Sequence, residues 1–317
     1  MRVCFACVGE NTVSYLNMMK LLIFSIRQNA AKLKSIQILL VTNGQSISED
    51  QQKTLARKFG HLKIKTMPRL GATPYTNKFN AFYAMNPKEY DVLVLVDCDV
   101  VVLREFDHIF ENLDTNDLSI KASGYGPVAA SKVKGYDLLI RRHCGFTDSQ
   151  LSTIQDATSR LGYPVFSSGL VVLTSAAVSA IREDAIRLTY RIYEDVVHVK
   201  GKPTNLRYRL GKLRKAFMHP VLEDRKPIRF PIWMSEQLGL SMAVLKHELY
   251  YEKLPKDVHS TSRDLINGEL PCFFHYPKGG YDIPRDKLFD GAWVNHYLAS
   301  DSSVEREFAK LAKSYAE

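Results

Sequence analysis

The chain has 317 residues, of which 45% are hydrophobic and 24% are charged, and its net charge is +9. These proportions are ordinary for a folded globular protein and exclude a disordered or fibrous chain. No apolar run approaches the roughly 20 residues of a membrane-spanning helix, and the start "MRVCFACVGE" lacks the length and flanks of a signal peptide.

Strand and helix patterns alternate along the first hundred residues. Strands are expected at 3–9, 35–44, 62–67 and 92–103. Helices are expected at 13–29, 48–60 and 77–85. The helix at 48–60 has Ser48 as its cap and Gly60 at its end. This alternation predicts an α/β fold with a mostly parallel sheet, helices on both faces, and ligands bound outside the carboxyl ends of the strands.

The remainder of the chain is less regular. Residues 121–137, "KASGYGPVAASKVKGYD", are predicted to form a loop, and residues 164–173 a strand. Further helices are expected at 176–198, 234–247 and 304–316. No linker divides the chain, so residues 1–317 are expected to form a single domain.

The chain contains five cysteines, Cys4, Cys7, Cys98, Cys144 and Cys272. Three lie in strand-like runs and the number is odd, so we expect small buried side chains and no disulfide framework. Cys4 and Cys7 have the C-x-x-C spacing of a redox or zinc site, but no second pair completes four ligands. No Asn-x-Ser/Thr acceptor occurs, and together these features favour a reducing cytoplasm.

Positive charge concentrates in residues 200–229, which hold ten Lys or Arg against Glu223 and Asp224. Such a segment is either a solvated surface or a contact for an anionic partner, such as a membrane surface or a phosphate-bearing substrate. Nucleic acid is not expected, because no recognised binding motif accompanies the charge. The segment "RRHCGF" at 141–146 is likewise either a phosphate contact or a solvated loop.

Two aspartates interrupt the apolar run "VLVLVDCDVVVL" at 92–103. Buried carboxylates without a compensating partner are unfavourable. Because strand 92–96 ends at Asp97, we expect Asp97 and Asp99 at the edge of the sheet where ligands bind. Alternation along a strand turns residues i and i+2 to one side, and paired carboxylates suit Mg²⁺ or Mn²⁺. The alternative is that both aspartates cap the next turn.

Around these aspartates the sequence resembles a family. "YTNKFNAFYAMNPKEYDVLVLVDCDVVVLREFDHIF", residues 75–110, is similar to the D-x-D region of GT-A fold glycosyltransferases, most closely the glycogenin and lipopolysaccharide galactosyltransferase family. In that family a helix with a lysine precedes a strand that ends in Asp-x-Asp. Lys78, Asp97 and Asp99 fall on the lysine and the two aspartates.

Four other segments extend the resemblance to about residue 280. "ENTVSYLNMMKLLIFSIRQN" resembles the opening strand-to-helix segment, with Tyr15 on the tyrosine that contacts the nucleoside. "FSSGLVVL" looks like the Phe-Asn-Ser-Gly strand, with Ser167 at the Asn position and Ser168 and Gly169 on Ser-Gly. "SEQLGLSMAV" resembles the Asp-Gln helix start, and "FFHYPKGG" the late segment that contains a histidine.

The resemblance implies a divalent ion, Mn²⁺ or Mg²⁺, that bridges the two phosphates of a nucleotide-sugar. Asp97, Asp99 and His275 would coordinate it, and Lys278 would reach the diphosphate. Residues 1–105 would form the nucleotide-sugar-binding half and 106–317 the acceptor-side half with the C-terminal helices. The alternative for His275 is a core histidine between two aromatic residues.

Several positions depart from the family pattern. Glu236 and Gln237 replace its Asp-Gln, Pro164 replaces an acidic residue, and Lys278 stands only three residues after His275. Glu236 could act as the general base of an inverting transfer. Alternatively, Glu236 and Gln237 flank the anomeric carbon in a retaining transfer, which the resemblance favours. Both residues could also be an ordinary helix start.

The expected activity is a metal-dependent hexosyl transfer from a nucleotide-sugar, with UDP favoured, to a hydroxyl acceptor in polysaccharide or glycoconjugate synthesis. The acceptor would be a glycan or a lipid-linked molecule, and the latter would involve peripheral membrane contact through residues 200–229. A sugar-phosphate nucleotidyltransferase is disfavoured because "CFACVGENT" lacks its Gly-rich, Arg-containing loop. A catalytically silent nucleotide- or carbohydrate-binding module with the same fold is the remaining alternative.

Overall fold

The computed structural model describes residues 1–30, 33, 36–70, 74–124, 139–147, 149–150, 166–195, 234–277 and 283–317. A seven-stranded sheet with the order β3-β2-β1-β4-β7-β6-β8 lies at its centre. Its strands are β1 (Val3–Gly9), β2 (Gln37–Asn43), β3 (Leu62–Met67), β4 (Val92–Val96), β6 (Ser119–Gly124), β7 (Phe166–Thr174) and β8 (Tyr250–Lys253). β1 to β4 pair in parallel, β7 runs antiparallel to both of its neighbours, and β6 and β8 are parallel.

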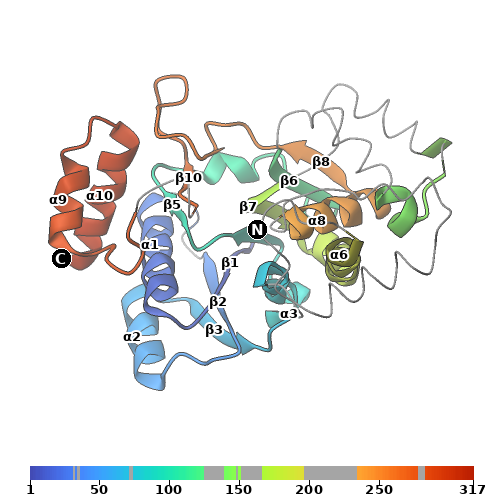
Figure 1. Ribbon diagram of the computed structural model, residues 1–317, viewed down its shortest axis with the longest axis horizontal. Coiled ribbons are helices and arrows are strands. Elements are labelled where there is room, and N and C mark those ends of the chain that lie inside the picture. Colours follow the sequence, from blue (N-terminus) through green and yellow to red (C-terminus); the bar gives the residue numbers. More distant parts are fainter. Residues whose placement is uncertain are drawn as a thin grey trace, which may run out of the picture.

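Helices cover both faces of this sheet (Figure 1). One face carries α1 (Val13–Asn29), α2 (Glu49–Phe59), α9 (Gly291–Leu298) and α10 (Ser303–Ala316). The other carries α3 (Ala81–Ala84), α6 (Ser175–Asp195) and α8 (Ser235–Lys246). The sheet is therefore buried on both sides, which is why its strands read as nearly continuous apolar runs.

A second sheet has three short strands, in the order β5 (Val100–Val102), β10 (Phe273–His275) and β9 (His259–Ser260). Its β5 follows β4 after a turn of three residues, so the predicted strand 92–103 is divided between two sheets. This small sheet joins the end of β4 to the C-terminal part of the chain. Phe308 of α10 extends the connection, because its ring lies 4.9 Å from that of Tyr276, the residue after β10.

Apart from this division, the predicted strands and helices are confirmed within a few residues, with two further corrections. In the helix predicted at 77–85, residues 77–80 belong to a 3-10 helix, η1 (Pro74–Asn80), and Ala81–Ala84 is α-helical. The side chain of Asn77 accepts a hydrogen bond from the amide of Leu70 at 2.7 Å, and such local bonds compete with a regular helix.

The second correction concerns the loop predicted at 121–137. Its first four residues belong to β6, which pairs with β7 and β8, and residues 125–137 lie outside the described residues. Tertiary pairing here overrides a weak strand propensity in "KASG".

The cysteines are free thiols, and four of the five are buried, as expected. Cys4 and Cys7 lie on opposite faces of β1 and pack in different cores, which excludes the redox or zinc pair. Burial raises the pKa of the Cys4 thiol to about 12. Among the described helices, none is both long and apolar enough to cross a bilayer.

Candidate active site

The two aspartates lie at the carboxyl edge of the main sheet. β4 ends at Val96, and the amide of Val100 donates to the carbonyl of Asp97 at 3.2 Å, which closes a turn over Asp97 to Asp99. The sheet thus places Asp97 and Asp99 at the strand end, as predicted. Their convergence comes from this turn and not from alternation within a strand.

Two strands distant in sequence bring further residues to this turn. In β7, Leu170 pairs with Val96, and the carbonyl of Gly169 accepts from the amide of Asp97 at 3.0 Å. In β10, His275 pairs with Val100. This pairing sets His275 beside the aspartates.

The three side chains turn one atom each toward a common point. Nε2 of His275 lies 3.3 Å from Oδ1 of Asp99 and 3.8 Å from Oδ2 of Asp97, and the group's potential ligand atoms all lie within 4.8 Å of one another. Two carboxylates and an imidazole on this scale fit a divalent ion such as Mn²⁺. The donor chemistry and the spacing of these residues therefore suit the metal that the sequence implied.

The outer oxygen of each aspartate is held by a cation. The ammonium of Lys78, in η1, pairs with Oδ1 of Asp97, and Nη2 of Arg285 donates to Oδ2 of Asp99 at 2.7 Å. The Asp97 and Asp99 side chains are 23% and 16% exposed, so each charge needs a partner. These ion pairs explain how an apolar strand can end in two acids.

The pKa directions follow from this arrangement. Burial by itself would raise the pKa of Asp99, but the His275 hydrogen bond and the charges of Arg285 and Lys78 bring it below its ordinary value. Burial opposes the charge of Lys78 too, yet the Asp97 and Glu236 carboxylates raise its pKa overall. Both residues therefore remain charged at neutral pH.

Glu236 and Gln237 lie in the first turn of α8, next to Lys78. A carboxylate oxygen of Glu236 lies 3.5 Å from the Lys78 ammonium, and burial raises the pKa of this carboxyl group despite that lysine. Gln237 Nε2 donates to the Ser168 hydroxyl at 3.4 Å, and the Ser168 carbonyl accepts from Lys78 at 2.9 Å. The structure thus joins Lys78, Ser168, Glu236 and Gln237 in one contact group next to Asp97.

Gly169 is required at its position by close packing. A Cβ atom there would lie 2.6 Å from Nδ1 of His275 and 3.0 Å from Nε2 of His259. The His259 and His275 rings stack with their centroids 5.7 Å apart, and Nδ1 of His259 is 2.7 Å from the Ser123 hydroxyl. Burial lowers the pKa of His259 to about 3, so its ring is neutral.

The sequence prediction missed two residues of this site, Arg285 and His259. Arg285 stands ten residues beyond His275 without a motif, and His259 lies in "DVHSTS", which has no recognisable spacing. The available signal for Arg285 was only a basic residue close behind the late histidine segment.

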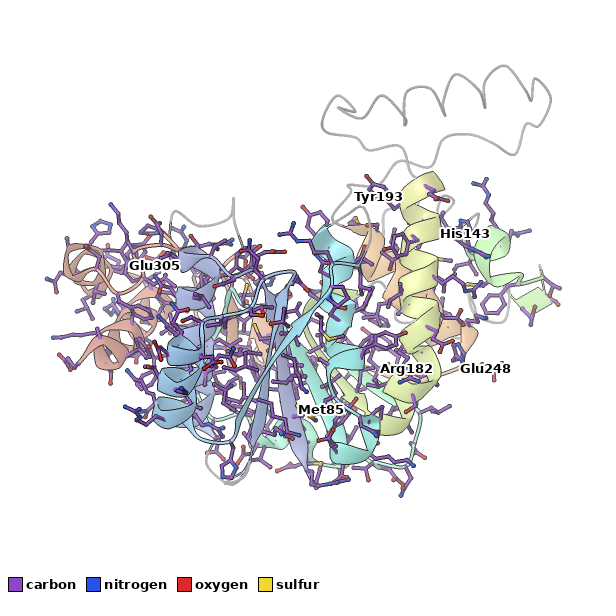
Figure 2. The ribbon with its side chains drawn as sticks, turned by 90° about the horizontal axis from the view of Figure 1, so that it is seen from below. Met85, His143, Arg182, Tyr193, Glu248 and Glu305 are labelled. Atoms are coloured by element: carbon purple, nitrogen blue, oxygen red, sulfur yellow. The ribbon has the colours of Figure 1, made fainter. Side chains whose placement is uncertain are left out.

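Of the remaining predicted residues, Tyr15 lies near the site, and the others lie away from it or outside the described residues. Tyr15 is partly buried near the site, where burial, with Cys98 and Asp99, raises its pKa to about 12 against the charge of Arg285. Lys278, Pro164 and residues 200–229 lie outside the described residues. Residues 139–144 are helical, and Figure 2 shows His143 beyond α6 on the outer flank, so this segment is not brought to the aspartates.

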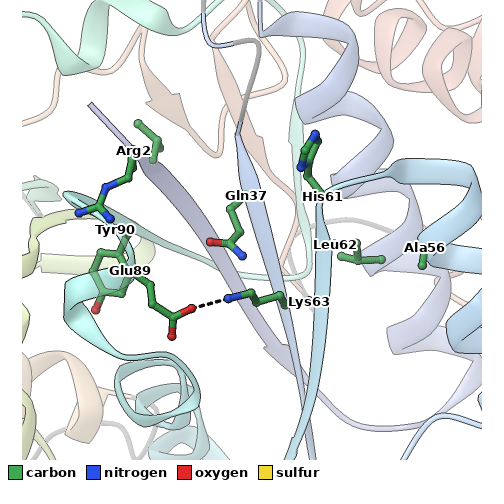
Figure 3. Close-up of a pocket in the computed structure, with 9 residues that line it drawn as sticks. Arg2, Gln37, Ala56, His61, Leu62, Lys63, Glu89 and Tyr90 are labelled. Carbon is green, nitrogen blue, oxygen red and sulfur yellow. Dashed lines mark hydrogen bonds and ion pairs between the residues drawn. The ribbon is translucent and has the colours of Figure 1, made fainter.

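A separate hollow of about 520 Å³ lies at the opposite edge of the sheet (Figure 3). Residues near the starts of β1, β2 and β3 line it, and the Lys63–Glu89 ion pair crosses it. Its position at the amino ends of the strands separates it from the aspartates.

No family model and no curated protein matches the sequence. Solved structures do match. GlyE of Streptococcus pneumoniae TIGR4, a glycosyltransferase, is 12% identical with a TM-score of 0.50, over 99% of this chain and 60% of GlyE. An active-site mutant of the galactosyltransferase LgtC is 14% identical with a TM-score of 0.50, over 99% of this chain and 96% of LgtC.

The bifunctional glycosyltransferase WbbM is 13% identical with a TM-score of 0.48, and the match covers 98% of this chain. The chain spans 51% of WbbM and 60% of GlyE. The fold is therefore the GT-A fold of glycosyltransferases, as the sequence predicted. At sequence identities of 12% and 14%, these structural matches establish the fold alone. The reaction therefore has to be argued from the residues of the site.

Proposed function

We propose that this protein is a metal-dependent glycosyltransferase that moves a hexose from a nucleotide-sugar, UDP-linked by preference, to a hydroxyl acceptor. The observation that carries this proposal is the convergence of Asp97, Asp99 and His275 at the carboxyl edge of a GT-A sheet. In open α/β sheets this edge is where ligands bind. The donor would lie over residues 1–105 and the acceptor over residues 106–317.

Asp97, Asp99 and His275 would hold Mn²⁺ or Mg²⁺, which supplies Lewis-acid stabilisation to the departing diphosphate. Lys78 pairs with the Asp97 carboxylate, and Arg285 pairs with that of Asp99. Tyr15 would contact the nucleoside, and Ser168, Gly169 and Lys278 would border the donor. Positive groups beside the leaving diphosphate favour the transition state over the ground state because the negative charge grows there.

Glu236 and Gln237 would lie at the sugar, and a retaining transfer is favoured. The pairing of Glu236 with Lys78 gives the carboxylate a counter-charge, and the hydrogen bond of Gln237 to Ser168 fixes its amide. A second candidate is an inverting transfer with Glu236 as the general base, and the raised pKa of this buried carboxyl group favours it. Measuring the anomeric configuration of the product by NMR separates the two.

The acceptor would be a glycan or a lipid-linked molecule in polysaccharide or glycoconjugate synthesis. A lipid-linked acceptor would be approached through peripheral membrane contact of the basic residues 200–229. Sedimentation with phosphatidylserine vesicles at low salt tests this contact. A protein that stays in the supernatant would exclude it.

The proposed activity is tested by incubating UDP-, GDP-, CDP- and dTDP-hexoses with the protein, Mn²⁺ and a panel of free sugars. We expect release of one nucleoside diphosphate, which chelation of Mn²⁺ stops and which Asp99→Asn lowers on the order of a hundredfold. Asp91→Asn is the matched control, because Asp91 precedes β4 at the other end of the strand. Binding of a nucleotide without turnover of any donor would instead indicate a catalytically silent module.

A further inference from the structure

Arg285 is a cation at Asp99 that the sequence did not suggest. It donates to Oδ2 of Asp99 at 2.7 Å, while Oδ1 of the same carboxylate faces His275 at 3.3 Å. The bond to Asp99 is short, whereas the second bond of Nη2, to the Tyr276 carbonyl, is 3.3 Å long. Arg285 is thus bound chiefly by the aspartate that would have to share its charge with a divalent ion.

Arg285 and a divalent ion would compete for the charge of Asp99. Lys78 and Arg285 already pair with the Asp97 and Asp99 carboxylates, and the buried Glu236 lies beside Lys78. A divalent ion on the inner oxygens would share the Asp99 carboxylate with the guanidinium. The two cations would repel one another in a partly buried site where water screens them little.

Hydrogen bonds hold the backbone around Arg285 without involving its side chain. The amide of Lys287 donates to the carbonyl of Pro284 at 2.9 Å, which closes a turn around Arg285. Asn17 of α1 fixes the next residue by donating to the carbonyl of Asp286 at 3.1 Å. A guanidinium fork binds phosphate oxygens in the same bidentate way as it binds a carboxylate.

We propose that Arg285 makes binding of the divalent ion conditional on the nucleotide. Building on the proposed function, Arg285 neutralises Asp99 when no donor is bound and moves to the diphosphate when the donor arrives. The guanidinium then releases the Asp99 carboxylate, which becomes free to bind the ion, and pairs with the phosphate. The ion and the nucleotide are thereby coupled, since each binds better when the other is present.

The test is calorimetric titration of Mn²⁺ into the protein, alone and with saturating UDP. Arg285→Gln should bind Mn²⁺ alone about tenfold more tightly than the wild type, and the factor by which UDP strengthens Mn²⁺ binding should fall about tenfold. Arg285→Lys keeps the charge and should stay within about threefold of the wild type. Arg285→Met replaces Arg285→Gln if circular dichroism shows that the latter is unfolded.

Arg2→Gln is the matched control, because Arg2 forms an Arg–Asp pair of the same 2.7 Å length with Asp91 at the other end of β4. It should leave Mn²⁺ binding unchanged. Equal or weaker binding of Mn²⁺ alone by Arg285→Gln would overturn the proposal, since Arg285 would then merely support Asp99. Failure of UDP to bind the wild type would refute the UDP preference of the proposed function, and the titration of Mn²⁺ alone would still report on Arg285.

Discussion

At the scale of single residues, the site depends on which partner each oxygen of the two aspartates contacts. Asp97 and Asp99 each give one oxygen to a cation of the chain and turn the other toward His275. Removing one partner of a buried pair leaves an uncompensated charge, which is more costly than never having buried the pair. The aspartates therefore depend on Lys78 and Arg285 for stability as well as for their orientation.

Gly169→Ala should damage the site without removing any ligand. The new Cβ would lie 2.6 Å from Nδ1 of His275, so the imidazole has to shift away from the aspartates. We expect Mn²⁺ affinity to fall by about tenfold or more, as is usual when the support of a metal ligand is lost. Titration of Mn²⁺ measures this effect, and an unchanged affinity would mean that His275 is not a ligand.

The aspartates and Lys78 could be predicted from the sequence because they lie within one continuous segment, 78–99, with a recognisable pattern. His275 was predicted from a weaker resemblance. Arg285 and His259 could not be predicted, because only the pairing of β10 with β5 and β9 brings them to Asp99 and Gly169. That pairing is tertiary and leaves no local pattern in the sequence.

At the scale of secondary-structure elements, the crossing of α6 and α8 requires a glycine. A Cβ at Gly239 would lie 2.0 Å from Oγ1 of Thr189 and 2.7 Å from its backbone nitrogen. Gly239→Ala should therefore lower the free energy of unfolding by about 1–3 kcal/mol through overpacking. Urea denaturation measures the change.

Gly291→Ala is the control for that substitution, because a Cβ at Gly291, in the first turn of α9, would meet no atom within 4 Å. It should leave stability unchanged or increase it by up to about 1 kcal/mol, as alanine favours the helix. Equal losses in the two variants would contradict close packing at the α6–α8 crossing.

An ion-pair group also joins these two helices. Asp184 of α6 accepts from Lys246 at 2.5 Å and lies 2.7 Å from Nε2 of His247, both near the end of α8, and Arg187 donates to it at 2.8 Å. Burial would raise the pKa of Asp184, but hydrogen bonds from Lys246, Arg187 and His247 hold it well below its usual range. Asp184 therefore contributes stability in its ionised form.

The sign of the pH effect follows from the lowered pKa. The contribution is complete above the unfolded-state pKa of about 4 and is lost as the pH falls toward the lower pKa of the folded state. Asp184→Asn should cost roughly 1–3 kcal/mol at pH 7, and the difference from the wild type should narrow between pH 4 and pH 2. A difference that is constant over this range in urea denaturation would show that the charge of Asp184 is not the cause.

Most elements could be predicted from periodicity, as in α1 and β4, where burial follows the sequence pattern closely. The 3-10 helix η1 and the strand β6 could not be predicted from periodicity. Asparagine side chains bonded to the backbone shape η1, and the pairing of "KASG" in β6 depends on its neighbours β7 and β8. The first departure comes from local side-chain bonds to the backbone, and the second from strand pairing that is remote in sequence.

At the scale of the whole molecule, the small sheet is the connection that assembles the site. It leaves the main sheet directly after Asp99 and pairs β5 with β10, and α10 packs on the same region through Phe308 and Tyr276. Figure 1 shows α9 and α10 beside α1, although they are far from it in sequence, and all three helices contribute to one hydrophobic core. The predicted order of alternating strands and helices was sufficient for the fold class, but not for the antiparallel β7 or this second sheet.

The central claim is that Asp97, Asp99 and His275 hold a divalent ion at the carboxyl edge of a GT-A sheet. Anomalous diffraction from crystals soaked with Mn²⁺ and UDP tests it most directly. We expect one Mn²⁺ peak bounded by these three side chains, with the UDP diphosphate beside it. A peak elsewhere, or UDP bound in the hollow lined by Arg2 and Lys63 at the opposite edge, would contradict the assignment.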